Sequence, residues 1–246
     1  MEIKNRNFYE TEIVKSLIKP VHNPNYDIHK LAVPLIACVV GGTGSGKTNL
    51  LMNILEVMDQ TFNKIIIFTM DRDEPLYNAL SLAVPPDQLK IFEGIANVTK
   101  QNMDKNIDRD DQTLLIFDDL CNSKESEQRP IGDMYIRGRK LNCSMLYLSQ
   151  KWSCIPTIIR AQCGYVFLKQ VDGKRQLQFI VGNYSPKDLT TEQINEIYKY
   201  CSQDRLDFLL IDLKESDKSK RFRRNLDEIL DIDYFIEEFP PKTKRR

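Results

Sequence analysis

Short apolar runs alternate with longer polar segments along the middle of the chain. Residues 35–40 form a continuous apolar run flanked by Pro34 and by glycines, which predicts a strand buried on both faces of a parallel sheet. A helix is expected over residues 46–59, because its apolar residues share one face at helical spacing: Leu50, Leu51, Ile54, Leu55 and Met58. Further buried strands are expected at residues 64–68, 113–117, 144–148 and 164–168. The alternation predicts an α/β fold with a central, mostly parallel sheet flanked by helices.

The two ends of the chain have a different pattern. Residues 1–30 are polar and predict an N-terminal extension with one short helix over residues 10–18. Residues 31–213 are expected to form the globular domain, which also includes strands at 176–181 and 207–213 and a helix at 190–201 that Thr190, Thr191 and Glu192 could cap. Residues 214–246 carry their charges in blocks, and we expect a mobile or partner-ordered tail.

A phosphate-binding loop follows the first buried strand. The run Gly-Gly-Thr-Gly-Ser-Gly-Lys-Thr at positions 41–48 matches the P-loop pattern, and a strand before it and an amphipathic helix after it supply the context that this pattern needs. Backbone N–H groups of such a loop point at phosphate oxygens, and the helix N-terminus adds partial positive charge. The predicted nucleotide-binding residues are Gly41, Gly42, Thr43, Gly44, Ser45, Gly46, Lys47, Thr48 and Asn49. Lys47 is expected on the β- and γ-phosphates and the Thr48 hydroxyl on Mg²⁺.

A second motif completes this site. Residues 114–117 are apolar and are followed by Asp118 and Asp119, which is the Walker B arrangement. Asp118 is expected to hold Mg²⁺, and Asp119 to act as the general base that polarises the attacking water. Paired aspartates after a strand can also be a solvated turn, but the P-loop upstream favours the catalytic interpretation. The two motifs together predict an ATPase of the ASCE type.

Several other polar residues are candidates for the same chemistry. Gln150 follows the strand predicted at 144–148 and is interpreted as a sensor of the γ-phosphate, with an ordinary turn glutamine as the alternative. The arginine-finger candidates are Arg137, Arg139 and Arg160, and each of them is more often a solvated residue or half of an ion pair. Residues 169–172 resemble a guanine-recognition motif only superficially, because Leu168 stands where Asn or Thr belongs, so ATP is preferred to GTP.

Composition narrows the class of protein without naming a partner. The 246 residues include 35 Lys plus Arg and 35 Asp plus Glu, so the net charge gives no argument for nucleic acid. The six cysteines include no Cys-x-x-Cys pair and lie mostly in apolar runs, which predicts buried thiols in a reducing compartment. No apolar run approaches the roughly 18 residues of a membrane span, and an intracellular, soluble protein is expected.

The order of these motifs resembles the FtsK/HerA superfamily, and within it the genome-packaging ATPases of poxviruses, other large DNA viruses and virophages. The resemblance covers about residues 33–185. Besides the P-loop and the Asp118–Asp119 motif, it is carried by the segments 137–144, 147–150 and 155–160. Two residues depart from the pattern: Lys140 stands where histidine is common, and Asp119 stands where many members carry Glu, which leaves the position of the water that Asp119 would polarise in doubt.

The resemblance implies a motor. It implies that the strand ending at Gln150 lies between the Walker A and Walker B strands, and that a homo-oligomeric ring, a pentamer or hexamer, drives double-stranded DNA into a preformed capsid. It further implies a capsid protein as partner, phosphate-backbone contacts, and action in the host cytoplasm, a viral factory or the virion. The basic residues at 218–224 and 242–246 could contact DNA or be solvated tail charge.

Two other functions remain open on the sequence alone. A P-loop kinase would need an acceptor site and an arginine-rich lid, for which only residues 174–178 offer a place. An ATP-dependent switch or assembly factor would need no water-activating pair, so Asp119 and Gln150 argue against it.

Overall fold

The computed structural model describes residues 6–120, 123–171, 173–185 and 187–240. Within these residues the strands are β1 Ile36–Val40, β2 Lys64–Thr69, β3 Leu89–Glu93, β4 Thr113–Asp118, β5 Cys143–Ser149, β6 Tyr165–Leu168, β7 Leu209–Asp212, β8 Phe222–Arg224 and β9 Glu228–Ile229. They form one sheet in the order β3-β2-β4-β5-β1-β6-β7-β8-β9. The pairs from β3 to β6 are parallel and the last three pairs are antiparallel. The predicted α/β fold with a mostly parallel sheet is confirmed.

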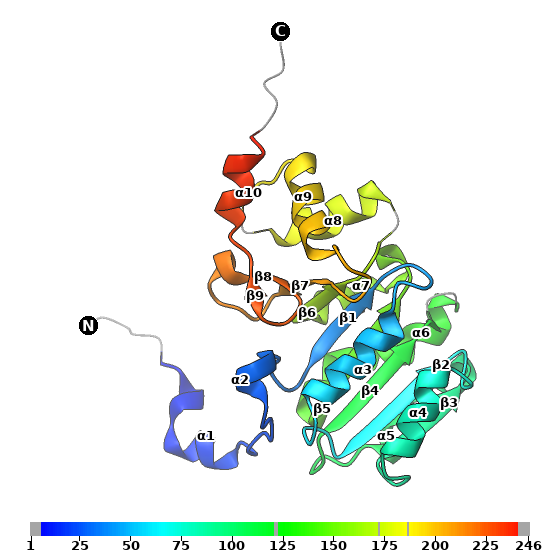
Figure 1. Cartoon of the computed structure of the whole chain (residues 1–246). Helices are drawn as coiled ribbons and strands as arrows, with labels where there is room; N and C mark the ends of the chain where they lie inside the picture. The colour runs from blue at the N-terminus through cyan, green and yellow to red at the C-terminus, as the bar shows by residue number, and fades with distance from the viewer. Residues whose placement is uncertain (1–5, 121–122, 172, 186, 241–246) are drawn as a thin grey trace.

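Helices cover both faces of this sheet (Figure 1). The α-helices are α1 Glu12–Leu17, α2 Tyr26–His29, α3 Lys47–Val57, α4 Pro75–Ala83, α5 Lys100–Asn106, α6 Glu125–Arg137, α7 Thr157–Gln162, α8 Lys174–Tyr184, α9 Thr191–Cys201 and α10 Ile232–Glu238. Short 3₁₀ turns occur at Phe8–Glu10, Ile95–Asn97, Gly138–Leu141, Trp152–Cys154 and Lys218–Lys220. None of the helices in the described part of the chain is long and apolar enough to cross a bilayer.

Alternating side chains of the strands divide the core into two layers. Ala37 and Val39 of β1 pack with Leu50 and Ile54 of α3 on one face. Cys38 and Val40, the residues between and after them, pack on the other face with residues from α5 to α10. Because side chains of a strand point to opposite faces in turn, a strand buried in both layers must be apolar throughout. The continuous apolar runs are thereby explained.

One predicted strand is a helix. Residues 176–181 lie within α8, whose buried residues Leu177, Ile180 and Val181 have i, i+3, i+4 spacing. Phe179, between them, is 54% exposed. The short apolar run fits both the strand period and the helix period, and the packing of α8 against α9 favours the helix.

Residues 214–240 are part of the globular domain and do not form a separate appendage. Strand β8 pairs with β7, and Phe222 is fully buried in the core. Arg223 forms a buried ion pair with Asp212, with 2.6 Å between Nη2 and Oδ2. The prediction of a mobile or partner-ordered tail is therefore wrong for this stretch, because the buried Phe222 and the ion-paired Arg223 and Arg224 attach it to the domain. Residues 242–246, the second basic group, lie outside the described residues.

The remaining sequence predictions are largely confirmed. The helix expected over 10–18 is α1, and α9 begins at a Thr190 N-cap in which Gln193 forms the reciprocal capping bond. Strand β3, at the edge of the sheet, was not predicted. Among the described cysteines, Cys38, Cys143, Cys163 and Cys201 are buried and Cys154 is half-buried, whereas Cys121 lies outside the described residues.

Candidate nucleotide site

Three polar segments meet at the carboxyl edge of the parallel strands. The P-loop leaves β1, Gln150 follows β5, and Asp118 ends β4. The N–H of Gly41 donates to the carbonyl of Ser149 at 3.1 Å, and the N–H of Asp119 donates to the carbonyl of Leu148 at 3.3 Å. Since β5 lies between β1 and β4, the backbone itself ties these segments together, as the resemblance implied.

Gly46 and Gly41 illustrate two reasons why the P-loop needs glycine. Gly46, the N-cap of α3, has φ of 86°, a left-handed conformation that a side chain disfavours. There is no room for a side chain at Gly41, because a Cβ there would lie 2.5 Å from Ser45 Oγ and 2.7 Å from Lys169 Cβ. These two glycines let the loop turn tightly at the start of α3, so that the helix N-terminus faces the same edge.

Lys47 and Ser45 have buried polar atoms with few or long hydrogen bonds to the protein. Lys47 is buried, and its Nζ donates to the carbonyl of Gly42 across a long 3.4 Å. Ser45 Oγ is buried without a hydrogen-bond partner. A buried ammonium and a buried hydroxyl with spare hydrogen-bonding capacity fit the phosphate oxygens that a P-loop holds.

Asp118 is a buried carboxylate held by a tyrosine of α4. The hydroxyl of Tyr77 donates to Asp118 Oδ2 at 2.6 Å, and both residues are buried. Burial raises the pKa of Asp118 to about 6; the charge of Asp119 acts in the same direction, whereas the Tyr77 hydrogen bond and Lys47 oppose it. Burial also raises the pKa of Tyr77, so its hydroxyl stays protonated as the donor. A buried carboxylate of this kind is stabilised by a bound cation.

Asp119 has a strained backbone. Its φ is 52°, which is uncommon for a residue with a side chain, and Asp119 Oδ1 is buried without a partner. Strain and an unsatisfied oxygen persist where the surrounding structure imposes them, and they occur preferentially at functional sites. The burial of Asp118 does not fit a solvated turn, whereas a positive φ such as that of Asp119 also occurs in turns.

A family model described as "Poxvirus A32 protein" matches residues 23–185. The chain belongs to this family. The DNA packaging protein OPG160 of Variola virus is 25% identical over 198 residues, covering 74% of this chain and 71% of that protein. The OPG160 protein of Vaccinia virus (strain Copenhagen) matches with the same identity and coverage.

The fold of this A32-family chain is also found among solved structures. The genome packaging NTPase B204 from Sulfolobus turreted icosahedral virus 2, in complex with AMPPCP, has a TM-score of 0.58 and 18% identity, covering 80% of this chain and 99% of that one. The same NTPase in complex with ATP-gammaS gives a TM-score of 0.55 and 16% identity over 81% of this chain and all of that one. The resemblance to the poxvirus proteins is thus confirmed at the level of the family, and the B204 structures share the fold.

The arginine candidates of the A32-family chain lie elsewhere. Arg137 is paired with Asp104 at 2.6 Å. Arg139 is exposed just before the amino end of β5, at the edge of the sheet opposite to the P-loop. Arg160 donates to Thr157 Oγ1 at 3.0 Å and stacks on Trp152. The contacts that the structure shows for Arg137 and Arg160 are therefore with residues outside the P-loop.

Three residues that the structure places at the site were not assigned to it from the sequence, although Lys169 was considered as part of the segment 169–172. Tyr77 reaches Asp118, as described above. Lys169, directly after β6, and Arg205, between α9 and β7, contact the P-loop from the side opposite to β4. The position of Lys169 at a strand end was a usable signal, whereas nothing local in the sequence marks Tyr77 or Arg205.

Proposed function

We propose that the chain is an ATP-hydrolysing motor that moves double-stranded viral DNA into a preformed capsid. The observation that carries this proposal is the meeting of the P-loop, Gln150 and the Asp118–Asp119 pair at one sheet edge, in a chain of the A32 family. The OPG160 relatives are DNA packaging proteins by name, and the B204 neighbours are genome packaging NTPases with bound nucleotide analogues.

The P-loop residues would bind the triphosphate. The backbone N–H groups of residues 42–48 would surround the phosphates, with Lys47 on the β- and γ-phosphates. Thr48, in the first turn of α3, and Asp118 would hold Mg²⁺, whose charge would neutralise developing negative charge on the phosphates. Metal binding also supplies the compensation that the buried Asp118 carboxylate lacks.

Asp119 and Gln150 would act on the attacking water. Asp119 directly follows β4 and has a carboxylate with one unpartnered oxygen, which suits a general base. Gln150 is half-buried at the end of β5 and would contact the γ-phosphate or orient the water. Arg139 and Arg160 would act on the nucleotide of a neighbouring subunit.

A ring is the assembly that suits a translocating motor, and five or six subunits are the sizes we propose. DNA would be held by its phosphate backbone, since a motor must move any sequence. Within the basic group at 218–224, Arg223 and Arg224 are paired with Asp212 and Asp207, and Lys220 is paired with Asp217. The exposed Lys218 is the cation of this group that we propose for contact with DNA or a capsid protein. The motor would act inside the infected cell, in the cytoplasm or a viral factory, or remain with the virion.

A kinase is the second candidate, and the position of its proposed lid segment argues against it. The segment 174–178, the only place that the sequence offered for a lid, is the first turn and a half of α8, which packs against α9. The third candidate is a switch protein. Such a protein needs no water-activating residue, so it would not explain the strained backbone of Asp119.

The test is the steady-state ATPase activity of the purified protein, with and without double-stranded DNA of unrelated sequences. Lys47→Ala and Asp119→Asn should abolish turnover, whereas Lys105→Ala, an exposed lysine near the opposite edge of the sheet, should leave it unchanged. DNA should stimulate hydrolysis regardless of sequence. Hydrolysis by an oligomeric preparation that ignores DNA would refute the motor and leave the nucleotide site standing.

A further inference from the structure

A buried lysine fastens a surface loop beside the P-loop. Lys169 is 1% exposed, and its Nζ donates to the carbonyls of Arg205, Leu206 and Asp207 at 2.7, 2.8 and 3.0 Å. An ammonium group has three protons, so these three bonds use all of them. The loop backbone at residues 205–207 is thus fixed by one side chain.

The same lysine packs against the P-loop. The N–H of Lys169 donates to the carbonyl of Val40 at 2.8 Å, and the N–H of Gly42 donates to the carbonyl of Gln170 at 2.7 Å. The stem of Lys169 fills the space next to Gly41 and Gly46. The distance between the P-loop and the loop at 205–207 is therefore set by a single, fully bonded side chain.

The second anchor of the loop is Asp207. Its carboxylate accepts from Arg224 Nη2 at 2.8 Å and from Asn225 Nδ2 at 3.0 Å, which ties the loop to β8. Because Lys169 on one side and Arg224 with Asn225 on the other hold the loop, the backbone of Arg205 has a fixed position.

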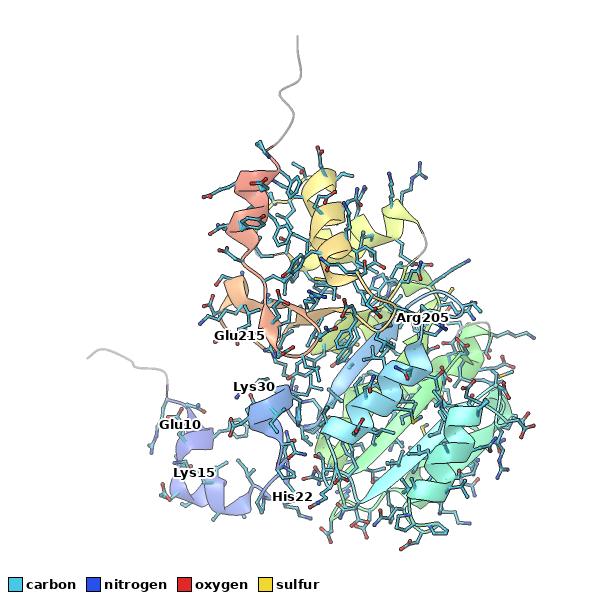
Figure 2. The ribbon with its side chains drawn as sticks, in the orientation of Figure 1. Glu10, Lys15, His22, Lys30, Arg205 and Glu215 are labelled. Carbon is cyan, nitrogen blue, oxygen red and sulfur yellow. The ribbon has the colours of Figure 1, made fainter. Side chains whose placement is uncertain are left out.

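Arg205 reaches across to the P-loop. Its Nη2 donates to the carbonyl of Gly44 at 3.2 Å, although the residue is exposed (Figure 2). A neutral carbonyl is a weaker acceptor for guanidinium than a phosphate oxygen, which can form charge-assisted and paired bonds. Gly44 stands in the loop whose N–H groups would surround the phosphates, so a bound triphosphate would lie within reach of the same side chain.

We propose that Arg205 is a nucleotide-binding residue acting in its own subunit, which exchanges the Gly44 carbonyl for a phosphate oxygen of ATP, and that Lys169 is the positioning residue for it. This inference rests on the proposed ATP site. It assigns to the P-loop a second cation, besides Lys47, that comes from a segment more than 150 residues further along the chain.

The experiment measures equilibrium affinity for ATP and ADP with Arg205→Ala, Arg205→Lys and Arg109→Ala. Arg109 is an exposed arginine near the opposite edge of the sheet and serves as the matched control. Loss of a hydrogen bond to a charged group should weaken ATP binding about tenfold in Arg205→Ala, less in Arg205→Lys, and not at all in Arg109→Ala. Lys169→Met should weaken binding as well, although Arg205 is intact.

A structural role of Arg205 is distinguished by the thermal midpoint without nucleotide. We expect the midpoint of Arg205→Ala to equal that of the wild type, while the increase on adding ATP is smaller. Wild-type affinity in Arg205→Ala, together with loss of binding in Lys47→Ala, would overturn the role of Arg205 and leave the proposed ATPase intact. Failure of the unaltered protein to bind ATP would instead remove the proposed function and this inference together.

Discussion

The two sides of the P-loop are built in opposite ways. On the β4 side, Asp118 is buried with a raised pKa, and Asp119 has both a strained backbone and an unpartnered oxygen. On the β6 side, Lys169 is equally buried, but each of its protons has an acceptor. Burying a charge costs free energy unless its bonds are satisfied. The difference teaches that the buried charge on the β4 side is left to be compensated by a ligand, whereas the buried charge of Lys169 on the β6 side is already compensated by the protein and serves as a support.

The loop at 205–207 is connected to β8, whose Phe222 lies in the core. Truncating Phe222 should have the largest effect on stability. Phe222→Ala leaves a cavity at a fully buried position and should lower the free energy of unfolding by about 3–5 kcal/mol. Ile229→Ala, at a position 51% exposed in β9, should change it little. Urea denaturation compares the two, and equal small effects would mean that β8 is not part of the core.

Asp118→Asn should separate function from stability on the β4 side. Loss of the carboxylate should reduce ATP turnover about 100-fold, since a metal ligand is removed. The same variant should be more stable without nucleotide by about 1–2 kcal/mol at pH 7, because it buries no charge.

The pH dependence of that stability gain follows from the raised pKa. The folded Asp118 has a pKa of about 6 against 3.8 as its ordinary value, so the folded wild type binds the extra proton first as the pH falls. The gain of Asp118→Asn should therefore be full above pH 6 and disappear between pH 6 and 4. A gain that is constant over this range would show that the carboxylate is not destabilised by burial.

Lys169→Met should have the opposite sign to Asp118→Asn. It leaves three loop carbonyls without their donor, and we expect a loss of roughly 2–3 kcal/mol in the free energy of unfolding. Lys105→Met, at an exposed position of α5, is the control. If Lys169→Met proved as stable as the wild type, the contrast between the two sides would fail.

Tyr77→Phe should produce the smallest change. The carboxylate of Asp118 loses the donor that lowers its pKa, so that pKa should rise further. The acid limb of the profile of kcat/KM against pH should then move to higher pH, with a stability change of only about 1 kcal/mol. An unshifted acid limb would mean that Tyr77 does not act on Asp118.

Much of the fold was predictable because the buried strands are apolar without interruption. β1, β2, β4, β5 and β6 were located to within one or two residues. The P-loop context was equally clear, since the motif has a fixed spacing between a strand and a helix. The failures concern segments with mixed signals. One is the run at 176–181, which fits two periods, and the other is the charged stretch around β8, where Phe222 is a single apolar residue among cations.

The sequence by itself determined the class of fold, the position of the P-loop and the acids that follow β4. It did so because these features depend on short-range periodicity and on residues adjacent in the chain. Only the tertiary structure decided that Tyr77 bonds to Asp118, that Lys169 holds the loop at 205–207, and that Arg205 reaches Gly44. These contacts join residues 36 to 161 positions apart, and no local pattern records which distant partner will satisfy a buried polar group.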